Sequence, residues 1–271
     1  MYWVQKRLLS QNFLIDRKLV KQLIRNSSIS TNDLVLEIGP GQGIITEELL
    51  GVAKEVIAVE LDRKLFEKLE LKFGQNSQLK LSQGNFLATP LPTSPYKVFS
   101  NIPFSITGYV VRKLLQATNP PTDCYLVVQS EAASKFIYNS GSNTMAATLY
   151  YPWWDIHINH RFQRSDFSPN PKVNVVLLHI QPRSFPFISS SQKSLYLDFV
   201  AYHFTRDRFA KFAPASQWLK MFKHFTTASD PEKLKPIQGA FAALQQEQRM
   251  LQKIHRTRTD HNWKKYRQVV Y

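Results

Sequence analysis

The chain has a single cysteine, Cys124, among its 271 residues. One thiol excludes an intramolecular disulfide, a C-x-x-C redox pair and a zinc site built from several cysteines. The sequence also lacks any run of 18 consecutive apolar residues, so no membrane span is expected. Polar residues interrupt the N-terminal apolar runs before an export signal could form. These absences predict a cytoplasmic protein that does not enter a membrane.

Acidic residues are few compared with basic ones. Against 35 Lys and Arg there are 20 Asp and Glu, giving a formal net charge of +15. Residues 1–182 hold 19 basic and 14 acidic residues, net +5, whereas residues 183–271 hold 16 and 6, net +10. Basic side chains interleaved with Trp263, Tyr266 and Tyr271 are typical of a surface that binds a polyanion. A solvated tail that only aids solubility is the alternative.

Short apolar runs alternate with helical patterns through the first two thirds of the chain. Strands are predicted at 33–38, 55–60, 79–82, 96–101 and 124–129, and helices at 44–50, 63–73 and 107–117. This alternation predicts an α/β fold, with a parallel sheet covered by helices on both faces. Two more strands, 156–162 and 173–180, follow without a long helix between them, so the sheet is expected to finish with an antiparallel pair.

After residue 182 the pattern becomes helical. A linker is predicted around 186–191, followed by helices at 195–204, 215–225, 234–244 and 245–255. We therefore predict three parts: an α/β domain over residues 1–182, a small helical domain over 183–250 and a basic tail over 251–271.

Three glycines follow the first predicted strand. Gly39, Gly41 and Gly43 occupy alternate positions where that strand should turn into a helix. Glycine permits a tight turn with positive φ and a close approach of the backbone to a ligand, and ligands of open α/β sheets bind at this edge. The spacing is G-x-G-x-G, which disfavours the G-x-G-x-x-G pattern of NAD-dependent enzymes.

The second strand ends in an acidic residue, Glu60. A carboxylate at this place can accept hydrogen bonds from both hydroxyls of a ribose, and would thereby hold a cofactor that contains a nucleoside. An idle, solvated carboxylate is the alternative interpretation.

The fourth strand runs into Asn101-Ile102-Pro103-Phe104. The exocyclic amine of a nucleobase is a poor nucleophile because its lone pair is delocalised into the ring. Hydrogen bonds accepted by the Asn101 side-chain carbonyl and a backbone carbonyl, expected at Ile102, would direct that lone pair at a methyl donor. Phe104 would supply a face on which an extruded base can stack. A plain Asn-x-Pro turn with Phe104 in the core is the alternative.

Taken together, these motifs resemble the rRNA adenine N6-methyltransferases, which include the macrolide-resistance methyltransferases of 23S rRNA and the small-subunit adenine dimethyltransferases. The resemblance rests on S-Q-N-F-L at 10–14, E-I-G-P-G-Q-G at 37–43, V-E-L-D around Glu60, N-I-P-F at 101–104, Q-S-E-A-A-S-K at 129–135 and F-S-P-N-P-K-V at 167–173. It implies a Rossmann-like, S-adenosylmethionine-dependent methyltransferase sheet with a small helical domain. It further implies a monomer that acts on rRNA without a metal.

The resemblance also implies roles for single residues. Asn12 and Leu14 match the segment that closes over S-adenosylmethionine, and Phe13 is expected beside the target adenine. Gly39, Gly41 and Glu60 would hold the donor, and Asn101, Ile102 and Phe104 the target adenine, with Asn101 also close to the donor. Phe167 matches a second aromatic residue that sandwiches the adenine.

One residue departs from the family pattern. Asn85 stands where the family usually has an Asp that accepts a hydrogen bond from the donor's adenine amine. An amide oxygen can still accept that bond, so a weaker contact is expected.

Two alternatives to a resistance-type 23S rRNA enzyme stay open. N-I-P-F-S-I-T at 101–107 is closer to the 23S group, and the small-subunit enzymes tend to N-L-P-Y, so a 16S rRNA dimethyltransferase is the nearest rival. A non-catalytic RNA-binding or ribosome-assembly factor is the other.

Overall fold

The computed structural model describes residues 12–138, 144–206, 212–227 and 234–250. The chain divides into two compact units, the first formed by residues 1–137 and 153–185 and the second by residues 138–152 and 186–271. The sequence predicted a change of architecture after residue 182. It did not predict that the segment 138–152 belongs with the second unit.

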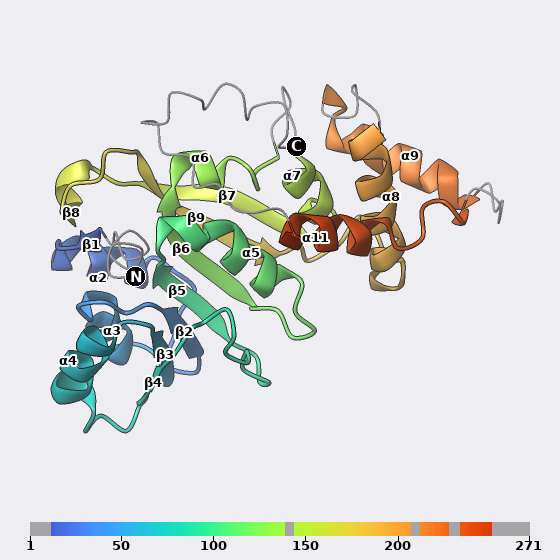
Figure 1. The fold of residues 1–271 in the computed structure, drawn as a ribbon. Helices are drawn as coiled ribbons and strands as arrows, with labels where there is room; N and C mark the ends of the chain where they lie inside the picture. Colours follow the sequence, from blue (N-terminus) through green and yellow to red (C-terminus); the bar gives the residue numbers. More distant parts are fainter. Residues whose placement is uncertain (1–11, 139–143, 207–211, 228–233, 251–271) are drawn as a thin grey trace. The chain divides into compact units, whose positions relative to one another are not determined.

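A seven-stranded sheet forms the first unit (Figure 1). Its strands are β2 (Leu34–Ile38), β3 (Glu55–Glu60), β4 (Leu79–Gln83), β5 (Lys97–Asn101), β6 (Asp123–Gln129), β7 (Trp154–Arg161) and β9 (Val175–Pro182). The spatial order is β4-β3-β2-β5-β6-β9-β7. The first five strands are parallel, whereas β9 pairs antiparallel with both β6 and β7. The predicted parallel sheet with an antiparallel end is therefore confirmed.

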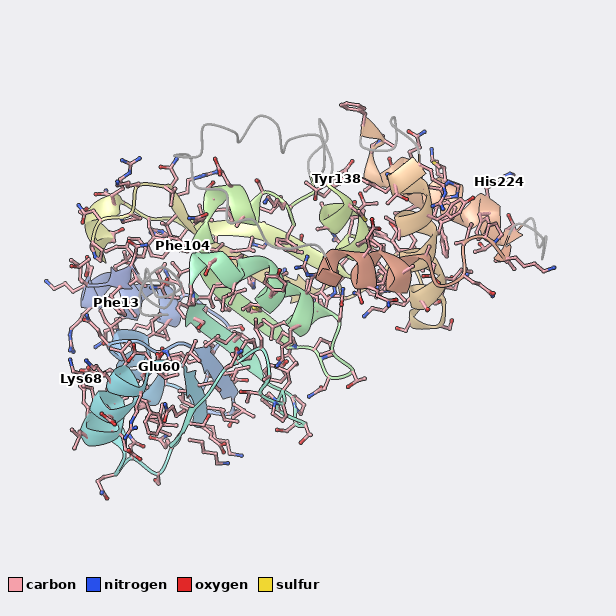
Figure 2. The ribbon with its side chains drawn as sticks, in the orientation of Figure 1. Phe13, Glu60, Lys68, Phe104, Tyr138 and His224 are labelled. Atoms are coloured by element: carbon pink, nitrogen blue, oxygen red, sulfur yellow. The ribbon has the colours of Figure 1, made fainter. Side chains whose placement is uncertain are left out.

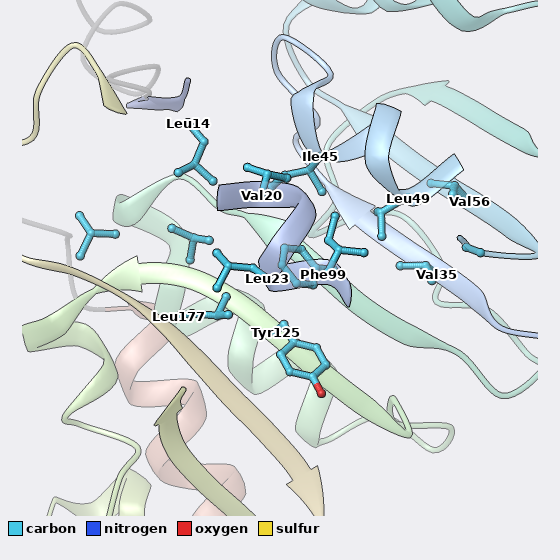
Figure 3. Packing of buried hydrophobic residues seen from close by; sticks show 14 of the residues in the cluster. Leu14, Val20, Leu23, Val35, Ile45, Leu49, Val56, Phe99, Tyr125 and Leu177 are labelled. Atoms are coloured by element: carbon cyan, nitrogen blue, oxygen red, sulfur yellow. The ribbon is translucent and has the colours of Figure 1, made fainter. Parts of the chain in front are cut away.

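Alternating side chains along the strands build the core of this unit. Helices accompany the sheet as α2 (Arg17–Arg25), α3 (Ile44–Leu50), α4 (Arg63–Phe73), α5 (Thr107–Leu115) and the short α6 (Ser130–Ala133). Val20 of α2 and Leu49 of α3 pack with Val35, Phe99 and Tyr125 of the strands (Figure 3). Successive residues of a strand point to opposite faces of the sheet. The face that carries Val35, Phe99 and Tyr125 is therefore the one that α2 and α3 cover.

A two-stranded pairing outside the main sheet was not predicted. Strand β1 (Phe13–Leu14) pairs antiparallel with β8 (Phe167–Ser168), so residues about 150 positions apart lie side by side. The backbone N–H of Ile15 extends the pairing by donating to the carbonyl of Asp166 at 2.9 Å. This pairing fixes the residues just before α2 at one edge of the first unit.

The second unit is helical among its described residues. It contains α7 (Met145–Tyr150), α8 (Lys193–Arg206), α9 (Ala215–Thr227) and α11 (Ala240–Met250). Phe199 of α8 meets Trp218 and Phe222 of α9 edge-on, and all three side chains are buried. The Tyr196 hydroxyl donates to the carbonyl of Thr148 at 3.1 Å, which ties α7 to α8. None of the described helices is long and apolar enough to cross a membrane.

The prediction of two consecutive helices at 234–244 and 245–255 was wrong. A single helix, α11, runs through the expected junction, and residues 251–255 and the predicted tail lie outside the described residues. Gly239 ends the turn before α11 and has a φ of +77°, a left-handed conformation that glycine adopts without strain. The carboxylate of Asp198 on α8 then accepts hydrogen bonds from the backbone N–H groups of Gly239 and Phe241, at 3.0 and 2.9 Å, and so starts the helix at residue 240.

Candidate active site

The glycine turn between β2 and α3 has the conformation that the sequence predicted. Gly39, Gly41 and Gly43 have φ values of +67°, +59° and +80°. A Cβ on Gly41 would lie 2.8 Å from Cε1 of Phe13, so the ring of Phe13 rests directly on the turn. At Gly39 the nearest atom to a Cβ would be Cδ of Pro103 at 3.9 Å, so this glycine faces the predicted base-binding segment at van der Waals distance.

The ends of β2 and β5 separate at this turn. The ladder pairs Val35 with Lys97 and Leu36 with Val98. Beyond them the hydroxyl of Ser100 bridges the two strands by accepting from the N–H and donating to the carbonyl of Ile38, each at 2.7 Å. From β2 the chain continues to β3 and β4 on one side of this gap, and from β5 it continues to β6 on the other side. Such a reversal of strand order is a topological switch point, where open α/β sheets bind ligands. Ser100 was missed by the sequence analysis, although it directly precedes the motif.

Two buried carboxyl groups lie beneath the glycine turn. Oε2 of Glu60 accepts from the N–H of Gly41 at 2.9 Å, and Oε1 accepts from the N–H of Asp62 at 2.8 Å. Burial raises the pKa of Glu60 in spite of these backbone hydrogen bonds. Oε2 of Glu37 accepts from the hydroxyl of Thr46 at 2.7 Å, and burial, reinforced by the charge of Glu60, raises the pKa of Glu37 to about 8. Glu37 is therefore mostly neutral at pH 7.

The amide of Asn101 is oriented by the N-terminal segment. Its Nδ2 donates to the backbone carbonyl of Asn12 at 2.8 Å. Within the described part of the chain no group donates to Oδ1 of Asn101, so the acceptor end of the amide is available. Ile102 is buried, Pro103 has φ −57°, and half-buried Phe104 begins a short 3-10 helix, η1 (Phe104–Ile106).

A small cavity lies among these groups. It is lined by Asn12, Phe13, Leu14, Gly39, Pro40, Gly41, Gln42, Ile44, Ile45, Asn101, Ile102, Pro103 and Phe104. Its volume is about 30 Å³, which holds one or two waters, whereas ligand pockets usually measure several hundred Å³. The ring of Phe13 packed on Gly41 narrows the cavity, so a ligand of nucleoside size requires that ring to move. Figure 2 labels Phe13, Glu60 and Phe104 around this edge of the sheet.

The cavity gathers most of the predicted site residues but not all. Glu60 lies behind the glycine turn and reaches it only through Gly41. Asn85 is exposed after β4, where its Oδ1 accepts from the N–H of Leu87 at 3.0 Å. Phe167 is fully buried and meets Phe162 edge-on at 5.4 Å, so in this structure it presents no ring face to the cavity. The sequence missed Pro40, Gln42, Ile44 and Ile45, although they belong to or directly follow the glycine motif.

Two solved structures share this fold over most of the chain. The 23S rRNA methyltransferase ErmE superposes with a TM-score of 0.70 at 24% identity, covering 78% of this chain and 98% of that one. A dimethyladenosine transferase from Plasmodium falciparum gives a TM-score of 0.64 at 24% identity, covering 72% of each chain. The sheet order and these neighbours define a Rossmann-like methyltransferase fold, as the sequence predicted.

Sequence comparison narrows the class to a family. Residues 4–238 match the family model described as ribosomal RNA adenine dimethylase, and the chain belongs to this family. A ribosomal RNA small subunit methyltransferase A from Nostoc sp. (strain PCC 7120 / SAG 25.82 / UTEX 2576) is 32% identical over 206 residues, covering 70% of this chain and 76% of the relative. An rRNA adenine N-6-methyltransferase from Bacteroides fragilis is also 32% identical, over 197 residues, covering 72% and 73%. The predicted enzyme class, a methyltransferase of the rRNA adenine family, is thereby confirmed.

Proposed function

We propose that this chain transfers methyl groups from S-adenosylmethionine to N6 of an adenine in 23S rRNA, twice in succession, acting as a cytoplasmic monomer. The observation that carries the proposal is the oriented amide of Asn101. Because Nδ2 is engaged by the carbonyl of Asn12, Oδ1 is the atom left to accept a hydrogen bond from an incoming amine.

The acceptor chemistry follows from the segment 101–104. An adenine extruded from the RNA would stack on Phe104. Its N6 amine would donate to Oδ1 of Asn101 and to the backbone carbonyl of Ile102, which concentrates the lone pair on the side facing the donor. Phe104 lines the cavity and Phe167 does not, so the stacking role is assigned to Phe104 rather than to buried Phe167. No proton has to be removed from the amine before transfer, so the site needs no general base for that step.

The residues on the donor side fit S-adenosylmethionine, which supplies an electrophilic methyl group when bound. Gly39 has only Cδ of Pro103, at 3.9 Å, near its Cβ position, and the N–H of Gly41 holds the Glu60 carboxylate at the same turn. Each oxygen of Glu60 accepts one backbone hydrogen bond and has a further lone pair for a ribose hydroxyl. Asn12 and Leu14 would cover the donor after Phe13 has moved. Asn85, after the neighbouring strand, would receive the donor's adenine.

Basic side chains on the helix that follows β1 suit an RNA backbone. Helix α2 begins three residues after β1, buries Val20 and exposes Lys18, Lys21 and Arg25. Among the described residues none of these three cations has an acidic partner, whereas Arg17 is paired with Glu47 at 2.6 Å. Phosphates flanking an extruded adenine would find free cations here, which predicts affinity that falls steeply with salt.

Modification of 16S rRNA is the second candidate. It is favoured by the relative from Nostoc, whose name specifies the small subunit and whose identity to this chain equals that of the Bacteroides relative. The 23S assignment relies on the N-I-P-F-S-I-T string at 101–107. If it is right, expression in a macrolide-susceptible bacterium would raise resistance to macrolides, lincosamides and streptogramin B.

Tritiated S-adenosylmethionine with purified 23S and 16S rRNA, followed by primer extension, tests the proposal. Methylation of 23S rRNA alone is expected, whereas labelling of 16S rRNA alone would select the second candidate. Asn101→Ala should abolish transfer and leave donor binding within about twofold, while Asn76→Ala, in the turn after α4, should behave as wild type. An active Asn101→Ala enzyme would refute the site. Donor binding without transfer to either RNA would instead indicate a non-catalytic rRNA-binding factor.

A further inference from the structure

Lys113 on α5 holds the turn that follows β4. Its ammonium group donates to the backbone carbonyls of Phe86 at 2.6 Å and Leu87 at 3.1 Å, and also to that of Thr89. The Nζ atom lies 4.7 Å from the centroid of the Phe86 ring. A lysine ammonium has three N–H donors, and here all three are used on one turn. No carboxylate in the described parts of the chain pairs with Lys113, so its charge is balanced by carbonyl dipoles and the face of the Phe86 ring.

The same turn begins with Asn85. Oδ1 of Asn85 accepts from the N–H of Leu87 at 3.0 Å, and its backbone carbonyl accepts from the N–H of Ala88 at 2.9 Å. The preceding residue, Gly84, donates its N–H to the carbonyl of Glu60 at 2.8 Å. Asn85 therefore satisfies the N–H groups of the turn, and Lys113 satisfies its carbonyls. Without the ammonium, the carbonyls of Leu87 and Thr89 would lose their donor, and that of Phe86 would keep only the N–H of Thr89 at 3.1 Å, so the turn would lose its outer support.

Lys113 also connects this turn to the predicted base-binding segment. Helix α5 starts at Thr107, directly after η1, and is anchored in the core by the buried side chains Val110, Val111 and Leu114. The backbone of α5 cannot shift without disturbing the core, so the helix holds the Cα atom of Lys113 in place. Helix α5 and the Lys113 ammonium thus connect the segment that contains Phe104 with the turn that begins at Asn85.

We propose that Lys113 is a positioning residue for the methyl donor: it holds the 85–89 turn so that Asn85 meets the adenine ring of S-adenosylmethionine. Lys113 itself touches neither donor nor RNA. This inference rests on the proposed function, because it takes the donor's adenine to bind at Asn85. It predicts a defect confined to donor binding, since the acceptor amide of Asn101 does not depend on the turn.

Arg112 provides a matched control. It is the next residue on the same helix, and its guanidinium lies 4.9 Å from the centroid of the Tyr109 ring. Lys113→Met and Arg112→Met remove the same charge, but the first alone removes the three contacts with the turn. Any effect of net charge on donor or RNA binding is therefore shared by the two variants, and the difference between them reports on the turn.

The experiment uses the full chain and two readouts. Amide hydrogen exchange without ligand should be about tenfold faster at Leu87 and Ala88 in Lys113→Met than in wild type or Arg112→Met, because the turn opens more often. Calorimetry should show donor affinity about fivefold to tenfold weaker in Lys113→Met, the equivalent of one lost hydrogen bond. The kcat at saturating donor should stay within about twofold. Lys113→Arg, which keeps the charge and part of the donor set, should recover part of the affinity.

A double-variant comparison separates positioning from general damage. In an Asn85→Ala background, Lys113→Met should cost less than about twofold in donor affinity, because the contact it positions is already gone. If Lys113→Met weakens donor binding as much in the Asn85→Ala background as in the wild-type background, the proposal is overturned. Three results for the single variant Lys113→Met would also overturn it: unchanged donor affinity, a loss of affinity equal to that of Arg112→Met, or a fall in kcat at saturating donor. A wild-type chain that does not bind S-adenosylmethionine would overturn the proposed function and, with it, the donor role of Lys113. Hydrogen exchange would still show whether the turn depends on the ammonium.

Discussion

Substituting Glu37 by glutamine should change how the stability of the first unit depends on pH. Glu37 is fully buried, accepts one hydrogen bond from Thr46 and has a pKa raised by burial to about 8, against an ordinary value of 4.5. The folded chain therefore retains a proton that the unfolded chain releases between these two pH values. Stability that depends on this proton is fully present below pH 4.5 and is lost as the pH rises toward 8.

The size of the effect follows from the shift. Each pKa unit corresponds to about 1.4 kcal/mol, so between pH 5 and pH 8 Glu37 alone should remove roughly 3 kcal/mol from the free energy of unfolding. A glutamine side chain has the same shape and no proton to release. Glu37→Gln should therefore be close to wild type, or slightly less stable, at pH 5 and clearly more stable at pH 8.

Urea unfolding at pH 5, 6, 7 and 8 measures this difference. Amide hydrogen exchange of the β2 and β3 peptides is the suitable probe, because it reports on the unit that contains Glu37 even if the two units unfold separately. Glu70→Gln, at an exposed position on α4, controls for the loss of a carboxylate. A gap between wild type and Glu37→Gln that stays constant over this pH range would refute the argument, because it would mean that Glu37 has the same charge in the folded and unfolded chain.

Four further substitutions test other parts of the structure. Gly41→Ala should lower the free energy of unfolding by about 1–2 kcal/mol in urea titrations, because alanine is strained at φ +59° and its Cβ meets the ring packed on the turn. Asp198→Ala should cost about 1 kcal/mol and speed amide exchange at the start of α11, because it removes the cap of that helix. Asn85→Asp should tighten donor binding in calorimetry, by about 1 kcal/mol, because a charged acceptor is stronger; unchanged or weaker binding would contradict that placement. Lys18→Ala combined with Lys21→Ala should reduce the slope of log affinity for rRNA against log salt by about 1.5 and leave donor affinity unchanged.

The fold was predictable from the sequence where the determinants are local. The seven strands of the sheet were recognised as short apolar runs between helical patterns, and the absence of a long helix between 156–162 and 173–180 indicated the antiparallel end. The start of α11 was not predictable, because its cap comes from Asp198, which lies 41 residues away on another helix. Likewise, nothing in the segment 138–152 indicates that it belongs with the second unit. Both features depend on contacts between residues far apart in the sequence.

The candidate site shows the same division. The glycine turn and the segment 101–104 were found because each has a local composition that only a few conformations satisfy. The position of Phe13 on Gly41, by contrast, depends on the pairing of β1 with β8, and two-residue strands leave no periodicity to detect. Phe167 was assigned to the site by resemblance, but pairing with β1 places its side chain in the core.

The proposed donor and acceptor halves of the site are joined through two adjacent residues. Phe13 packs on Gly41 at the donor side, and the carbonyl of Asn12 holds the amide of Asn101 at the acceptor side. Because these residues share one peptide unit, a movement of the Phe13 ring large enough to admit a nucleoside also acts on the carbonyl that orients Asn101. Displacing Phe13 by a side-chain rotation alone would leave the amide in place, whereas a shift of the β1 backbone would release it. The hydrogen bond from Asn101 to Asn12 is therefore the contact whose presence or loss distinguishes the two ways of opening the cavity.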